Sequence, residues 1–243
     1  MVQHLRLFCP LNNNFAPSYI HMTTLENSID EAKRIETLYR YEILDTPPDG
    51  SFDHITKLAS TLFNVPIAII SLVDTDRIWF KSTHGLTINQ IDRAPGLCAS
   101  AILSDDVYVL NDASKDSRSL ANSLVASEFG LKFYAAVPLQ TEDNCNLGTL
   151  CIIDKVPRTL DDRERLILKQ LGEIVMGEMN SRLSLRKTVS TVKKLTSDIG
   201  YHLDDTIEGI ENLSAEDQKV KILEYLEASK TFLRNVENQL DFR

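Results

Sequence analysis

The amino-acid sequence predicts an α+β fold: an antiparallel sheet flanked by helices, followed by a long helix and a C-terminal helical hairpin. Three observations support this prediction. Two segments with helical spacing precede the middle of the chain, strand-like apolar segments fill that middle, and everything after Pro157 has helical spacing again. Because helices and strands occur in separate blocks, an antiparallel sheet is favoured.

The N-terminal quarter combines one unpatterned segment with two predicted helices. Residues 1–22 show no periodicity, and we expect them to be disordered or to belong to an over-extended gene model. A helix is predicted over 25–44, because apolar residues recur every three or four positions until the turn-forming stretch 45–50. A second helix is predicted to begin at Ser51 as its N-cap. Its apolar side is predicted to comprise Phe52, Ile55, Leu58, Ala59 and Leu62.

The middle of the chain has the composition of a sheet. Strands are predicted at 66–73, 77–83, 107–110, 133–140 and 147–154. The first is almost continuously apolar and rich in isoleucine, which is typical of a central strand. A short helical piece is expected around 98–103, and residues 111–130 are predicted to be irregular.

The C-terminal third is predicted to be helical throughout. Thr159 is a predicted N-cap, and acidic residues follow it in the first turn, where they favour the helix dipole. A heptad-like apolar seam continues on both sides of a turn at 212–217, which predicts a hairpin over 184–243. Ser214 followed by Asp217 resembles a capping box. Two helices with narrow seams bury little by themselves, so a homodimer with coiled-coil packing is expected.

Composition excludes several classes of function. The net charge of −9 and the lack of a basic block argue against nucleic acid and anionic membranes as partners. No apolar run approaches about 20 residues, and no secretory signal precedes Met22, so a cytoplasmic protein is expected. The four cysteines lack metal-binding spacing, and no glycine-rich phosphate loop or nucleophile elbow is present. We therefore expect no metal, no cofactor and no catalytic constellation.

An ordered series of motifs connects these elements. It includes Tyr-Glu-Ile-Leu-Asp-Thr-Pro-Pro at 41–48, Trp-Phe-Lys-Ser at 79–82, Cys-Ala at 98–99, Phe-Tyr at 133–134 and Gly-Thr-Leu-Cys at 148–151. From about Ile35 to about Leu183 the series resembles the GAF domain, in the subfamily that often occurs at the front of bacterial signalling proteins. The resemblance implies a sensory domain over 23–183 that responds to an unknown small-molecule ligand or a partner.

The same resemblance implies a set of ligand-binding residues. They are Trp79, Cys98, Asp112, Arg118 and Tyr134. For Trp79 the alternative is a large core residue on a sheet face. For Asp112 and Arg118 the alternative is an ordinary turn or surface-pair role. The chain has Leu-Cys-Ala-Ser at 97–100 where members of the family often have Phe-Cys-Ala-His.

Two other functions are implied by weaker resemblances. Residues from about Thr191 onward resemble the dimerisation and phosphoacceptor hairpin of sensor histidine kinases, with His202 as phosphoacceptor and a histidine kinase or response regulator as partner. Leu203 follows that histidine where kinases place an acid. Free-methionine-sulfoxide reductases also occur among GAF domains. That chemistry needs a thiolate and a resolving thiol in one pocket, and the candidate partner of Cys98 is Cys151, inside an apolar strand.

Overall fold

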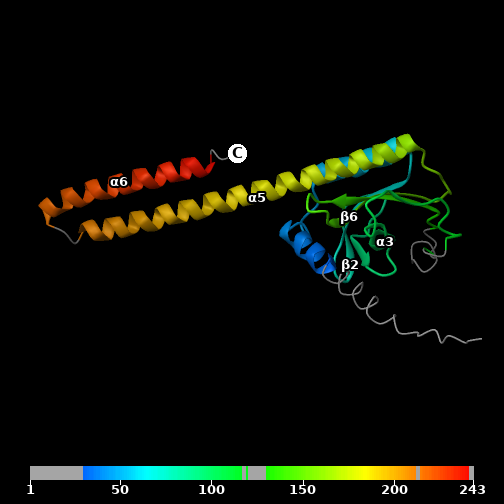
Figure 1. Cartoon of the computed structure of the whole chain (residues 1–243), viewed down its shortest axis with the longest axis horizontal. Coiled ribbons are helices and arrows are strands. Elements are labelled where there is room, and N and C mark those ends of the chain that lie inside the picture. The colour runs from blue at the N-terminus through cyan, green and yellow to red at the C-terminus, as the bar shows by residue number, and fades with distance from the viewer. Residues whose placement is uncertain (1–29, 117–118, 120–129, 212–213, 241–243) are drawn as a thin grey trace, which may run out of the picture. The chain divides into compact units, whose positions relative to one another are not determined.

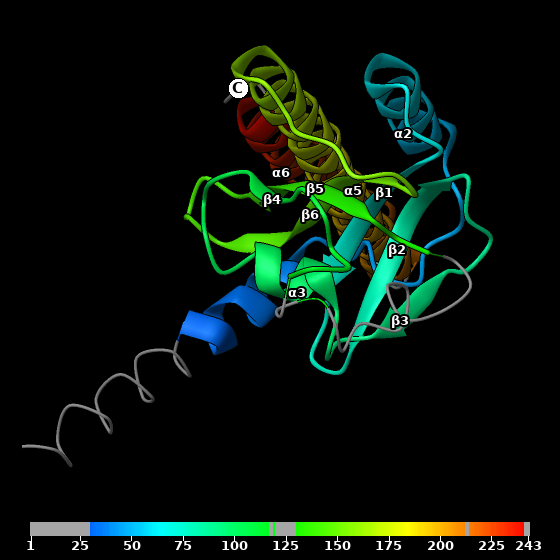
Figure 2. The ribbon, with the colours of Figure 1, turned by 90° about the vertical axis from the view of Figure 1, so that its right-hand side faces the viewer.

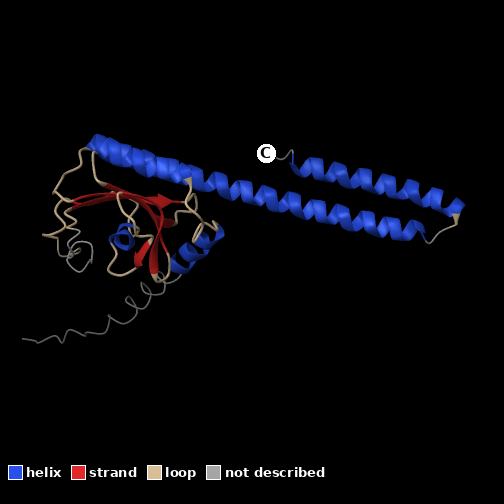
Figure 3. Cartoon of the chain, turned by 180° about the vertical axis from the view of Figure 1, so that it is seen from behind, coloured by secondary structure: helices blue, strands red, loops and turns tan. Residues whose placement is uncertain are grey.

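A computed structural model describes residues 30–116, 119, 130–211 and 214–240 (Figure 1). The chain divides into two compact units, Met1–Asn180 and Ser181–Arg243. The first unit contains an antiparallel six-stranded sheet in the order β3-β2-β1-β6-β5-β4. The second unit is helical (Figure 3). The predicted α+β class, with its antiparallel sheet and C-terminal helices, is confirmed.

The strands lie close to their predicted positions. They are β1 Ile67–Val73, β2 Arg77–His84, β3 Gln90–Asp92, β4 Tyr108–Leu110, β5 Phe133–Gln140 and β6 Asn146–Asp154. Every residue of β1 is buried, which agrees with its prediction as a central strand. The three-residue β3 was not predicted, because its polar sequence Gln-Ile-Asp carries no strand signal of its own and depends on pairing with β2.

Helices cover both faces of the sheet (Figure 2). The short helix α3, Leu97–Ala101, packs on β1, β5 and β6 from one side. The helix α2, Gly50–Phe63, packs on the other side, together with the first part of α5, where Gly172 lies against Val137 of β5. Coverage on both faces explains why the central strands are apolar at consecutive positions rather than at alternate ones.

Helix α2 differs from its prediction at its start and along one side. Its N-cap is Asp49 rather than Ser51, and the Asp49 carboxylate accepts a hydrogen bond from the Ser51 amide. Leu58 and Leu62 are 46% and 54% exposed, so their predicted burial is wrong. The buried side consists of Phe52, Ile55, Thr56, Ala59, Ser60 and Phe63. Thr56 and Ser60, four residues apart, occupy that buried face, and the larger Leu58 and Leu62 therefore lie on the exposed side of the helix.

The first described helix covers residues 30–40, and residues 25–29 of the prediction lie outside the described part. It ends four residues before the predicted position. The backbone enters the left-handed region at Glu42 (φ 47°) and again at Asp45 (φ 56°), which stops the helical hydrogen-bond pattern ahead of the two prolines. Arg34 anchors this helix, since its guanidinium donates to the Val73 carbonyl and to Glu31.

Glu31 makes the anchoring of this helix depend on pH. Its carboxylate accepts from Arg34 and pairs with Arg93 at 2.7 Å, and these contacts lower its pKa from 4.5 to about 2. A lowered folded-state pKa stabilises the protein above pH 4.5, and that contribution is lost as the pH falls toward 2. We expect Glu31→Gln to flatten the pH dependence of urea midpoints between these values, whereas Asp30→Asn, at the exposed neighbour, leaves the slope unchanged. An equal slope for Glu31→Gln and the parent would contradict this coupling.

The long helix α5, Asp162–Glu211, and the helix α6, Ala215–Leu240, make up the helical C-terminal part. Asp161 rather than the predicted Thr159 caps α5: its carboxylate accepts from the Glu164 amide at 2.7 Å, and Glu164 accepts from the Asp161 amide at 3.0 Å. At the start of α6 the Ser214 hydroxyl donates to the Asp217 carboxylate and accepts from the Asp217 amide. The predicted interaction between these two side chains is therefore confirmed.

Candidate functional site

The sheet face under α3 brings polar side chains together inside the core. Strand alternation points Ser71 of β1, Tyr134 of β5 and both Thr149 and Cys151 of β6 to this face. Helix α3 adds Cys98 from above, and the surrounding cluster is otherwise apolar and fully buried. Polar groups in such a core must satisfy one another.

The hydrogen bonds of this polar group converge on one sulfur. The Tyr134 hydroxyl donates to Cys98 Sγ at 3.3 Å, and the Ser71 and Thr149 hydroxyl oxygens lie 2.9 Å apart. Four donors lower the pKa of the Cys98 thiol to about 6, against the opposing effect of burial: the Cys151 thiol first, then the hydroxyls of Ser71, Tyr134 and Thr149. The hydrogen bond to Cys98, together with burial, raises the pKa of Cys151. Burial raises the pKa of Tyr134. The arrangement therefore favours a thiolate at Cys98 and a thiol at Cys151.

A small enclosed cavity adjoins the two sulfurs. Its volume is about 20 Å³, and its lining includes Leu97, Cys98, Leu131, Tyr134 and Cys151. A cavity needs about 10–15 Å³ to hold one water molecule, so this one has room for a single water.

The predicted ligand residues divide between the two faces of the sheet. Cys98 and Tyr134 meet under α3. Trp79 is buried on the opposite face, where it lies beside Lys81 and borders an open pocket of about 430 Å³. Neighbouring strand residues point to opposite faces, so Phe80 reaches the Cys98 cavity and Trp79 cannot.

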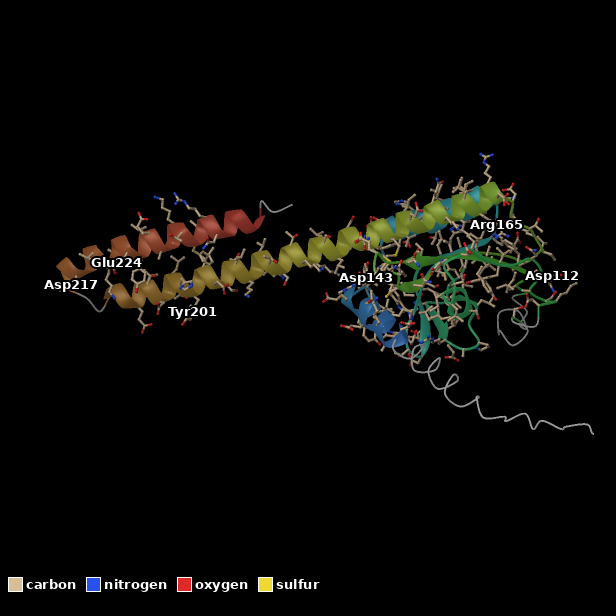
Figure 4. All side chains as sticks on the ribbon, viewed as in Figure 1. Asp112, Asp143, Arg165, Tyr201, Asp217 and Glu224 are labelled. Atoms are coloured by element: carbon tan, nitrogen blue, oxygen red, sulfur yellow. The ribbon has the colours of Figure 1, made fainter. Side chains whose placement is uncertain are left out.

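Asp112 follows β4, at the periphery of the first unit (Figure 4). Its carboxylate accepts from the Ser114 hydroxyl at 2.6 Å and pairs with Lys115 at 3.0 Å, and these contacts lower its pKa. This is the local turn role that was the alternative for this residue. Arg118, the remaining predicted ligand residue, lies outside the described residues.

Lys81 was singled out only as part of a motif, yet its environment is unusual. The side chain is almost completely buried, and Nζ donates to the Thr46 hydroxyl and the Pro47 carbonyl, each at 2.8 Å. The ammonium group also lies 5.4 Å from the centre of the Phe52 ring. It therefore fastens the loop before α2 to strand β2. A lysine in the middle of a predicted strand, directly after Trp79 and Phe80, was the available signal.

The second unit places His202 on α5, opposite α6. Its ring lies 6.1 Å from that of Phe232 in an edge-on arrangement, and its backbone carbonyl accepts from the Thr206 hydroxyl. His202, Thr206 and Phe232 belong to the lining of a groove of about 620 Å³ between the two helices. Leu203 and Leu233 lie along the same groove and remain more than half exposed.

Two features are missing from the described part of the chain. No helix there combines the length and hydropathy required to cross a membrane. In the same residues, no group of three or more His, Cys, Asp or Glu side chains is placed to hold a metal ion.

This chain is similar in sequence to a characterised bacterial protein. The chain is 37% identical over 153 residues to a cyclic di-GMP phosphodiesterase of Pseudomonas aeruginosa. That match covers 63% of this chain but only 26% of the phosphodiesterase, so the chain spans about a quarter of that relative.

Solved structures with a related fold have lower identity. The GAF domain of an Acinetobacter phosphoenolpyruvate-protein phosphotransferase is 18% identical, with a TM-score of 0.47, and covers 62% of this chain and 93% of that one. A free methionine-R-sulfoxide reductase from Thermoplasma acidophilum is 12% identical, with the same TM-score. The match covers 54% of this chain and 92% of the reductase.

The family model described as the GAF domain matches residues 47–179, which is more than half of the chain. The matched span begins just before α2, contains the whole sheet and ends within the part of α5 that belongs to the first unit. The chain therefore belongs to the GAF domain family, whose role in signalling proteins is sensory or regulatory.

Proposed function

We propose that the chain is a cytoplasmic signal-transduction protein in which the GAF unit senses a ligand or partner and passes the signal to a C-terminal hairpin that pairs with a second copy. One observation carries this proposal: α5 contributes to both compact units. Because the helix is continuous, a shift of its N-terminal part against the sheet can be passed along the same helix into the hairpin. Cytoplasmic placement is supported by Cys98, Cys145 and Cys151, which are all free thiols.

Pairing with a second copy is supported by the exposed apolar residues of the hairpin. Those on α5 include Leu203 and Ile207, which are 52% and 55% exposed, and those on α6 include Leu226 and Leu233, at 61% and 52%. Burying the exposed half of such a side chain contributes about 1 kcal/mol. A second hairpin presents the same apolar seam. In a symmetric four-helix bundle the seam of each hairpin is buried against that of its partner, so these residues are covered in both copies.

This pairing predicts a dimer that depends on the α6 seam. We expect the purified chain to have the mass of two copies in light scattering, and the double variant Leu226→Lys, Leu233→Lys to have the mass of one, because lysines cannot be buried in the bundle without a large desolvation cost. Glu224→Lys, at an exposed polar position of the same helix, is the matched control and should remain dimeric. A dimer that persists in the double variant would place the interface elsewhere.

The activity named for the Pseudomonas relative is not extended to this chain. The shared region is only about a quarter of that protein, so its named activity as a whole stays with the relative.

A second candidate function is that His202 accepts phosphate, with a histidine kinase as the donor or a response regulator as the recipient. The observation that favours it is that the exposed imidazole lies on the open groove of the hairpin. We expect incubation of the full chain with potassium phosphoramidate to add one acid-labile phosphate, and His202→Ala to abolish it. His54→Ala, which removes an exposed histidine of α2, is the control. Labelling that survives in His202→Ala would remove this candidate.

A further inference from the structure

Cys98 and Cys151 are neighbouring thiols in the described residues that the proposed function does not use. Both are free thiols, fully buried, and both line the cavity of about 20 Å³. They come from different elements, α3 and β6, and from positions more than fifty residues apart in the sequence. The third described cysteine, Cys145, is also buried and free but lies elsewhere, near Thr37.

The surroundings of Cys98 are built for a nucleophilic sulfur. A thiolate in an apolar core is costly unless donors compensate for lost hydration. Here the Tyr134 hydroxyl donates directly to Cys98 Sγ at 3.3 Å, and the Ser71–Thr149 hydroxyl pair lies on the same sheet face. Hydrogen bonds from the Cys151 thiol first, and then from these groups, lower the pKa of Cys98, so Cys98 ionises more readily than Cys151 does.

We propose that Cys98 and Cys151 are an oxidisable thiol pair, which hydroperoxides convert into a disulfide between α3 and β6. In the first step the Cys98 thiolate attacks the terminal oxygen of a hydroperoxide. An S–O bond forms, the O–O bond breaks, and the leaving alkoxide takes the proton that Cys98 had released. In the second step the Cys151 sulfur attacks the resulting sulfenic acid, an S–S bond forms, and the S–O bond breaks with loss of water, which carries away the Cys151 proton.

The two thiols and one hydroperoxide account for all atoms and electrons of this reaction. Two thiols lose two electrons in total, the hydroperoxide gains them, and one alcohol and one water are released, or two waters when the oxidant is hydrogen peroxide. Because the pKa of Cys151 is raised, its sulfur gives up its proton as it attacks, and the proton leaves with the departing oxygen as water.

Access to the sulfurs is through local opening of α3. This helix has only five residues, and its N-cap is Gly96, which has no side chain to cap the first backbone amides. Opening of such a short element costs less than global unfolding. The disulfide then ties α3 to the centre of the sheet, so oxidation changes how freely the cover of the cavity moves.

The test is peptide mapping of the unmodified full chain after treatment with hydrogen peroxide, acid quenching and alkylation. We expect loss of two hydrogens per chain and a cross-linked peptide pair containing Cys98 and Cys151, formed before modification of Cys145 or Cys9. The parent protein suffices, so the result does not depend on whether a core variant folds. Oxidation of Cys145 or Cys9 at the same rate as Cys98, or accumulation of Cys98 sulfinic acid without the cross-link, would overturn the proposal.

Two tyrosine variants test whether the donor to Cys98 matters. Tyr134→Phe removes the hydroxyl that donates to Cys98 Sγ, and we expect oxidation at pH 7 to slow by about two- to tenfold and its pH midpoint to rise. Tyr108→Phe makes the same chemical change in the neighbouring ring, 6.1 Å away, and should leave both quantities unchanged. Equal effects of the two variants would show that packing rather than the hydrogen bond sets the reactivity, against the proposal.

Discussion

Gly148→Ala is expected to lower the free energy of unfolding of the first unit by about 3 kcal/mol, the size typical of severe steric conflicts in a core. Gly148 pairs with Leu72 at the centre of the sheet. A Cβ atom at this position would overlap the Ser71 carbonyl oxygen and approach Leu72 Cα to 2.8 Å. Both obstacles are backbone atoms of β1, which is buried on both faces, so neither can move aside without separating the two central strands.

A matched substitution separates this conflict from a general effect of replacing glycine. Gly177 lies inside α5 within the first unit, and a Cβ atom there would meet no atom within 4 Å. Gly177→Ala should therefore raise stability by about 0.5–1 kcal/mol. Urea unfolding followed by the fluorescence of Trp79, the single tryptophan, measures both variants. A cost below about 1 kcal/mol for Gly148→Ala would mean that β1 and β6 can separate easily.

The sheet could be predicted because its signals are local. The isoleucine-rich run that became β1 and the largely apolar segments that became β5 and β6 each carry their own strand signal. Strand β3 has no such signal and exists through its partner β2.

The candidate site was predictable only in part, because its members meet through tertiary packing. Cys98 and Tyr134 were both predicted as ligand-binding residues, and the structure places the Tyr134 hydroxyl 3.3 Å from Cys98 Sγ. Cys151 was considered as a partner but set aside as a residue of an apolar strand, and the same strand turns out to present it to Cys98. Ser71 and Thr149 carried a weaker signal: a hydroxyl residue at the centre of an otherwise apolar strand has to find a buried partner.

Caps and helix faces show the limits of sequence patterns at the level of single residues. Ser51 and Thr159 are good N-cap residues, but Asp49 and Asp161 hold those positions. In both cases an aspartate lies two residues away, and the choice depends on where the preceding loop enters the helix. Neighbouring residues with similar capping propensity compete for the N-cap position, so sequence alone locates the start of a helix only to within about two residues.

Phe52→Ala is expected to cost about 3–5 kcal/mol of unfolding free energy, the usual range for removing a fully buried aromatic ring. Phe52 is 0% exposed, and its ring lies under the Lys81 ammonium group. Its removal leaves a cavity between α2 and β2 and exposes a buried cation to that cavity. Helical spacing placed Phe52 and Leu62 on one side of α2, whereas the structure leaves Leu62 54% exposed.

The pair of substitutions Phe52→Ala and Leu62→Ala therefore discriminates between the sequence pattern and the observed packing of α2. If the pattern were right, both would create core cavities and both would cost several kcal/mol. With the packing observed here, Leu62→Ala should change stability by about 0.5 kcal/mol or less, as surface substitutions do. Urea midpoints measured with the same Trp79 signal give both values, and comparable losses for the two variants would place Leu62 in the core and turn α2 about its axis.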